Sequence, residues 1–182
     1  SAGVLRTTAM YGDTLILKTL GVVYRSTPLP FTNAYGRILF NDNIRFVDPA
    51  GGYVVIKSAA LGTTFTCDIV NFRKVGSELY YDYSPLALAA NGCGIPSNYT
   101  FEQGDSIWTY PYIKLDQNIG NTNVERQFDH TLYVADRDVS AYTLGTKPAC
   151  NYNTGNLGAD TSCHAYYCNT NQDNFNFVGY AL

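Results

Sequence analysis

The sequence predicts an all-β protein, an antiparallel β-sandwich of jelly-roll or immunoglobulin-like type, and two observations lead to it. The first is composition: the 182-residue chain has 16 Tyr, 16 Gly and 9 Phe, and only 15% of its residues are charged. A helical bundle would be rich in Ala, Glu, Lys and Leu, whereas aromatic and β-branched residues suit a sheet and Gly suits its turns. The second is spacing, because short apolar runs alternate with short turn segments, as in sandwiches and barrels.

The N-terminal part is predicted to form an arm on a single domain. Residues 1–12 are strand-like but have no partner strand joined to them by a tight turn. We therefore interpret them as an arm or donor strand, and residues 13–182 as one sandwich domain. The pairing residues of the arm are expected to be Val4, Leu5, Thr7 and Thr8. The run Thr14 to Tyr24 is apolar on both alternating faces, which predicts a strand covered on both sides.

The next elements are expected to be short strands with antiparallel neighbours. The predicted strands are Arg37–Phe40, Ile44–Val47, Tyr53–Ala59, Thr63–Phe72 and Glu78–Tyr83. Short Gly-, Asn- and Pro-containing spacers separate them, which favours hairpin connections. Helix-forming residues are concentrated only at Pro85–Ala90, where one or two helical turns are predicted.

The C-terminal third is predicted to contain strands around a long loop. The predicted strands are Asp105–Leu115, His130–Asp136 and Asn174–Ala181. From Lys147 onward no further Lys or Arg occurs and Asn recurs. We interpret this stretch as a long C-terminal loop pinned by a disulfide, feeding the last strand.

The cysteines and a glycosylation sequon indicate an oxidising, extracellular location. The five cysteines are Cys67, Cys93, Cys150, Cys163 and Cys168, and Asn98 begins an Asn-Tyr-Thr sequon. We expect Cys150 to pair with Cys163 or Cys168, while Cys67 and Cys93 pair with each other or with the tail. Asn98 is expected to lie in an exposed, glycosylated loop. The absence of Met before Ser1 is consistent with removal of a signal peptide.

No group of residues predicts catalysis or a metal. Asp129 and His130 are neighbours, so in one strand their side chains point to opposite faces and cannot act as a base with its orienting acid. Cys163, His164 and Cys168 lack the second pair of ligands that a structural zinc site needs. Asp136 and Asp138 are more typical of a solvated strand than of a calcium site. We therefore predict that the chain is not an enzyme and carries no metal and no cofactor.

The most informative aromatic residues are Trp108, Tyr110 and Tyr112, which share one face of a predicted strand. Such a row suits stacking against sugar rings, and it suits a protein interface equally well. A third interpretation is that these rings only cover the core from its rim. The sequence leaves the three alternatives open.

Charge and hydropathy restrict the partners. The net charge is −3, and no cluster of Lys or Arg suggests binding to phosphates, so nucleic acid is not an expected partner. No apolar run approaches the roughly 20 residues of a membrane-spanning helix. The predicted function is a secreted structural protein, the subunit of an extracellular filament, pilus-like fibre or surface coat in which subunits join by β-strand addition. The partner would be the chain itself. The alternative is an extracellular lectin-like module that binds glycans.

Overall fold

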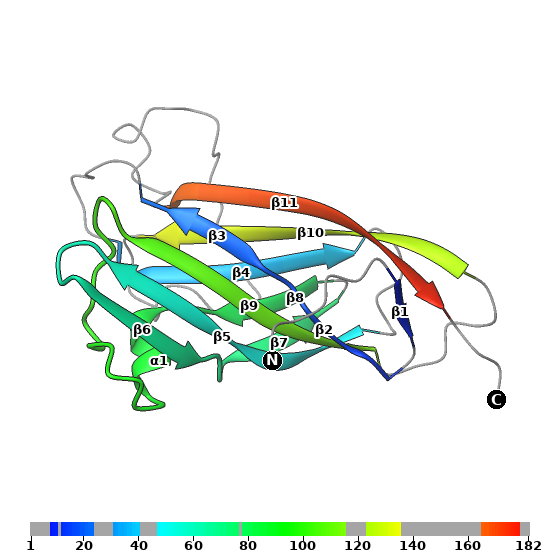
Figure 1. Ribbon diagram of the computed structural model, residues 1–182, viewed down its shortest axis with the longest axis horizontal. Helices are drawn as coiled ribbons and strands as arrows, with labels where there is room; N and C mark the ends of the chain where they lie inside the picture. The colour runs from blue at the N-terminus through cyan, green and yellow to red at the C-terminus, as the bar shows by residue number, and fades with distance from the viewer. Residues whose placement is uncertain are drawn as a thin grey trace.

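The protein is an antiparallel β-sandwich, as the sequence predicts (Figure 1). The computed structural model describes residues 8–10, 12–23, 31–40, 47–76, 78–115, 123–135 and 165–178. The six-stranded sheet has the order β1-β11-β10-β4-β8-β7. Its strands are β1 (Thr8–Met10), β4 (Asn33–Phe40), β7 (Phe72–Val75), β8 (Glu78–Asp82), β10 (Asn123–Ala135) and β11 (Ala165–Val178).

The second layer is a five-stranded sheet built around β9. Its order is β2-β9-β5-β6, with β3 paired to β9 beside β2. Its strands are β2 (Thr14–Ile16), β3 (Thr19–Val22), β5 (Val47–Ser58), β6 (Thr63–Asp68) and β9 (Ser106–Leu115). Every strand pair described is antiparallel except β1 with β11, which is parallel.

A bulge lets a proline lie within the central strand β9. Pro111 has no N–H for the sheet, and the register of β5 against β9 shifts between Pro49 and Gly52, opposite that proline. Gly52 has φ +133°, and a Cβ there would lie 2.3 Å from the carbonyl oxygen of Tyr110. Only glycine fits this position. The bulge also explains why the segment 48–52, expected as a spacer, continues the strand.

The described part of the run that begins at Thr14, residues 14–23, is not covered on both sides, so the prediction of a fully buried strand is wrong there. It forms β2 and β3, both paired with β9, and buried and more exposed residues alternate along them. Leu15 and Leu17 face the core, whereas Ile16 is 52% exposed. The apolar residues on the outward side therefore belong to a surface of the five-stranded sheet.

The core between the sheets is mainly apolar, and the imidazole of His130 is among the polar groups buried in it. Ile38 and Leu79 of one sheet and Ile56 and Ile107 of the other are almost completely buried. His130, on β10, lies between them, with Nδ1 2.6 Å from the Thr19 hydroxyl and Nε2 3.3 Å from the Tyr83 hydroxyl. Thr19 lies on β3, so this contact joins the two sheets. Burial lowers the pKa of His130 to about 3, so the imidazole is neutral at physiological pH.

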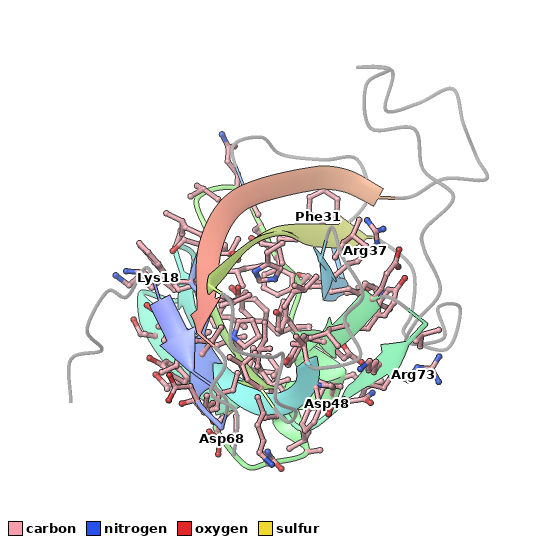
Figure 2. All side chains as sticks on the ribbon, turned by 90° about the vertical axis from the view of Figure 1, so that its right-hand side faces the viewer. Lys18, Phe31, Arg37, Asp48, Asp68 and Arg73 are labelled. Carbon is pink, nitrogen blue, oxygen red and sulfur yellow. A yellow bond between two sulfur atoms is a disulfide. The ribbon has the colours of Figure 1, made fainter. Side chains whose placement is uncertain are left out.

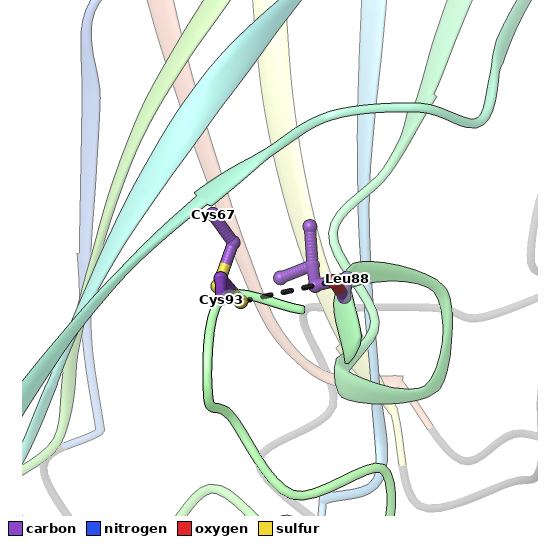
Figure 3. Close-up of a disulfide and its surroundings, with 3 residues drawn as sticks. All are labelled: Cys67, Leu88 and Cys93. Carbon is purple, nitrogen blue, oxygen red and sulfur yellow. Dashed lines mark hydrogen bonds between the residues drawn. A yellow bond between two sulfur atoms is a disulfide. The ribbon is translucent and has the colours of Figure 1, made fainter. Parts of the chain in front are cut away.

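The predicted helix is present as α1 (Pro85–Ala89), with a proline in its first turn and Leu88 buried. After α1 the chain turns back to β6, where Cys93 forms a disulfide with Cys67 (Figure 3). The two Cα atoms are 5.1 Å apart. Cys93 Sγ also lies 3.7 Å from the carbonyl oxygen of Leu88. Of the pairings that the sequence left open for these two cysteines, the structure shows the pairing with each other.

Several predictions on the C-terminal third fall outside the described residues. Cys150, Cys163 and the expected pinned loop lie there, and Cys168 is described only as backbone within β11. The strands β10 and β11 are longer than predicted and begin earlier, at Asn123 and Ala165. They pair with each other over almost their full lengths.

Candidate functional site

The aromatic row predicted from the sequence lies on the outer surface of the five-stranded sheet. Along β9 the residues between Ile107 and Ile113 alternate, so that Trp108, Tyr110 and Tyr112 are partly exposed and their neighbours are buried. The alternation arises because one face of the strand packs on the core and the other faces outward. We call the outward-facing side chains of β2, β3, β5, β6 and β9, together with Lys18, the aromatic face.

Neighbouring side chains occupy the faces of several of these rings. Tyr53 of β5 stacks on Tyr110, with ring centroids 4.4 Å apart and an angle of 12° between the planes. Tyr112 meets Tyr53 edge-on at 6.3 Å. The ammonium of Lys18 lies 4.4 Å from the centre of a Trp108 ring and 5.9 Å from that of Tyr110. Each of these contacts occupies one face of a ring, which reduces the ring surface that is open to a stacking sugar.

Sequence reasoning missed several members of the aromatic face. Tyr53, Val55 and Lys57 repeat with period two on β5, and that pattern alone would have placed them on one face. Lys18, Ile16 and Leu20 were missed because the whole run from Thr14 to Tyr24 was assigned to the core. The register that sets Tyr53 opposite Tyr110 could not be read from the sequence.

The predicted glycosylation site lies in a loop held by one buried carboxylate. Asn98 is exposed and lies in a turn. The next residue, Tyr99, is buried, and its hydroxyl donates to Asp105 Oδ2 at 2.6 Å. Asp105 also accepts from the backbone N–H groups of Glu102 at 2.9 Å and Ala59 at 2.8 Å. Burial and the nearby Asp105 raise the pKa of Tyr99, which stays neutral. Glycosylation of Asn98 stays a prediction.

The N-terminal arm is partly described. Val4, Leu5 and Thr7 lie outside the described residues, whereas Thr8 begins β1. This strand lies at the edge of the six-stranded sheet and pairs in parallel with the end of β11, with Thr8 opposite Asn176. Gly12 follows with φ +85°, and its N–H donates to the carbonyl oxygen of Leu115 at 2.8 Å. The chain thus crosses from one sheet to the other at this glycine.

Other candidate groups give no site in the part of the chain that is described. His130 is buried and bonded to Thr19 and Tyr83, so it is not placed to meet a substrate from solvent. Within the same residues no three His, Cys, Asp or Glu side chains converge on a point where a metal ion would fit. Asp136, Asp138 and His164 lie outside them. Among the described helices none has the length and apolar character to cross a membrane.

Comparison with known proteins does not assign this β-sandwich to a family. No protein-family model and no curated protein matches the chain. A solved structure described as "AvmM Catalyzes Macrocyclization in Alchivemycin A Biosynthesis" aligns with 98% of this chain and 87% of its own, at 12% identity and a TM-score of 0.47.

The expectation that the chain is not an enzyme is contradicted by that similarity, because AvmM catalyses a macrocyclization, and the expectation is withdrawn. At 12% identity and a TM-score of 0.47 the similarity brings neither a reaction nor a functional residue to this chain.

Proposed function

We propose that this chain is a structural subunit of an extracellular filament, fibre or coat, in which the arm of one copy adds a strand to the six-stranded sheet of the next. One observation carries the proposal. Among the described residues, β11 pairs with β10 along one side, but on its other side it pairs only with β1, over Asn176–Val178. We therefore take the outer edge of residues 165–175, which has no partner among the described residues, as the template for another strand.

The register of β1 indicates how an arm would fill this edge. Thr8 lies opposite Asn176, so in the same parallel register residues 1–7 of an arm would pair with residues 169–175. An arm from a neighbouring copy would make the same main-chain hydrogen bonds as the chain's own arm, so the exchange changes few contacts. Because each copy then gives its arm to the next, the assembly is open rather than a closed pair.

The two edges of the six-stranded sheet support growth at one side only. Between Ala165 and Val178 the strand β11 has no Lys, Arg or Pro, the residues that natural sheets use to block edge pairing. The opposite edge is β7, a strand of four residues that includes Arg73 and Lys74. A short, cationic edge of this kind resists pairing, so under this proposal the arm adds at the β11 side of the sheet.

Removing residues 1–10 tests the proposal. The truncated chain should fold, as judged by far-UV circular dichroism, but it should be unable to form filaments or large particles in light scattering and electron microscopy. A synthetic peptide with the sequence of residues 1–10 should bind the truncated chain, because it restores the missing strand. A peptide of the same composition in scrambled order is the matched control. Truncated protein that assembles like the full chain would refute the role of the arm.

A further inference from the structure

The aromatic face has its charges ordered from one edge of the five-stranded sheet to the other. Strand pairing defines rows that run across the sheet, and one row consists of Leu20, Trp108, Val55 and Thr66. The adjacent row consists of Lys18, Tyr110, Tyr53 and Asp68. A third row has Thr14, Lys114 and Asp48. In the rows that contain both charges, the lysine lies on the side of β2 and β9 and the aspartate on the side of β5 and β6.

We propose that the aromatic face binds a second copy of this chain, face to face, about a twofold axis parallel to the strands and between β9 and β5. Such an axis reverses the strand order, so β2-β9-β5-β6 of one copy lies over β6-β5-β9-β2 of the other. Each residue then meets the residue at the opposite position of its own row, as in any isologous contact.

Charge complementarity is the first argument for this occupant. Lys18 and Asp68 end the same row, and both are exposed; Figure 2 labels Lys18 at the left of the molecule and Asp68 below it, near the bottom. The twofold axis brings Lys18 of each copy to Asp68 of the other, which forms two equivalent ion pairs. Lys114 also comes near Asp48 of the other copy, but these two already lie opposite each other within one chain, and Asp48 contacts Lys74 at 3.4 Å, so the pair Lys18–Asp68 carries the argument. Lys57 meets Ser106, so no like charges are brought together.

The uncharged side chains agree with the same arrangement. Trp108 meets Val55 and Tyr110 meets Tyr53 across the interface, so partly exposed rings become covered. Tyr and Trp are the residues most enriched at the centres of protein interfaces. Four strand positions about 4.8 Å apart and rows about 6.6 Å apart give a flat area of roughly 400–500 Å². This is a little more than half of the roughly 800 Å² per partner of a standard interface, which corresponds to a weak, reversible contact.

This contact is independent of the arm, because β1 belongs to the other sheet. Sugar stacking would use the rings alone, and one face of Tyr110 and of Trp108 already contacts Tyr53 or Lys18. The order of the charges, by contrast, is complementary to itself under the proposed axis. One subunit could therefore form a dimer through the aromatic face and, separately, a filament through the arm.

Cross-linking of the full chain tests the proposal directly. A zero-length carbodiimide joins an amine to a carboxylate only when they touch. Within one chain, Lys18 and Asp68 are separated by three strand positions, about 14 Å, so a cross-link between them reports two copies. In an equal mixture of ¹⁴N- and ¹⁵N-labelled protein, mass spectrometry should find Lys18–Asp68 peptides that combine both isotopes. Their absence would overturn the proposal.

Charge reversal supplies the second part of the test. K18D and D68K should each weaken self-association, measured by mass photometry, by about tenfold to a hundredfold, because each brings like charges together. The double variant should restore both association and the cross-link. K57D is the matched control and should change association by less than about threefold. Deleting residues 1–10 should leave the cross-link in place. This distinguishes failure of the proposed role of the arm from failure of the proposed contact between aromatic faces.

Two results would show a different occupant. Oligosaccharide binding that is lost with W108A, in a chain that gives no mixed-isotope cross-link, would identify a sugar site and overturn the paired interface. Equal association of K18D, D68K and the double variant would show that the charges do not set the contact, which also overturns it.

Discussion

Acid should destabilise the protein through His130, because this histidine is buried in the neutral form. Its pKa is about 3 in the folded protein, against an ordinary value of 6.5. The unfolded chain therefore binds the proton first, so the stabilisation is complete above pH 6.5 and is lost as the pH falls toward 3. The slope approaches about 1.4 kcal/mol per pH unit, and the loss between pH 6 and pH 4 comes to about 2.5 kcal/mol.

The assay compares the free energies of unfolding of the natural chain and His130→Gln. Urea unfolding is followed at pH 6, 5 and 4 by the fluorescence of Trp108, the single tryptophan of the chain. Glutamine keeps a hydrogen-bonding side chain but does not titrate, so the variant should be less stable than the natural chain at pH 6 and should lose less stability on acidification. Burial raises the pKa of Asp82, which acts in the opposite direction, but Asp82 is present in both proteins and cancels in the difference.

The second histidine provides the control. His164→Gln should leave the steep loss of stability between pH 6 and pH 4 in place, because His130 is intact in that variant. If the difference in stability between the natural chain and His130→Gln were the same at pH 6 and pH 4, the histidine would not be buried neutral in solution. The reasoning from its burial would then be refuted.

Two further predictions concern the loop that carries Asn98. Asp105→Asn should lower the free energy of unfolding in urea by about 2–3 kcal/mol, because the amide cannot accept all three hydrogen bonds that the carboxylate accepts. Tyr99→Phe removes one of these hydrogen bonds and should lower it by about 1 kcal/mol. Equal losses in the two variants would contradict this assignment. Replacing both Cys67 and Cys93 by Ser should cost about 3.5 kcal/mol, the chain-entropy value for their separation of 26 residues. An unchanged midpoint on reduction of the natural chain would contradict it.

Local patterns were enough for the features that depend on a few neighbouring residues. The alternation along residues 106–115 placed Trp108, Tyr110 and Tyr112 on one face of β9, because successive side chains of a strand point to opposite faces wherever the strand lies. The helix after Ser84 was predicted for a similar reason, since Pro at its start and Ala and Leu within it favour a helical turn. The all-β class followed from composition, which reflects how many residues must suit a sheet.

Tertiary structure decided what depends on pairing between distant segments. The segment from Thr14 has the same apolar residues whether it lies inside a sheet or on its outer face, and only its pairing with β9 exposes Ile16 and Lys18. The neutral state of His130 depends on its burial between the two sheets, where it contacts Thr19, 111 residues away in the sequence. The Cys67–Cys93 disulfide and the row from Lys18 to Asp68 likewise depend on which distant segments lie side by side. Register sets these neighbours, and it is fixed by the packing of the whole sheet rather than by any segment alone.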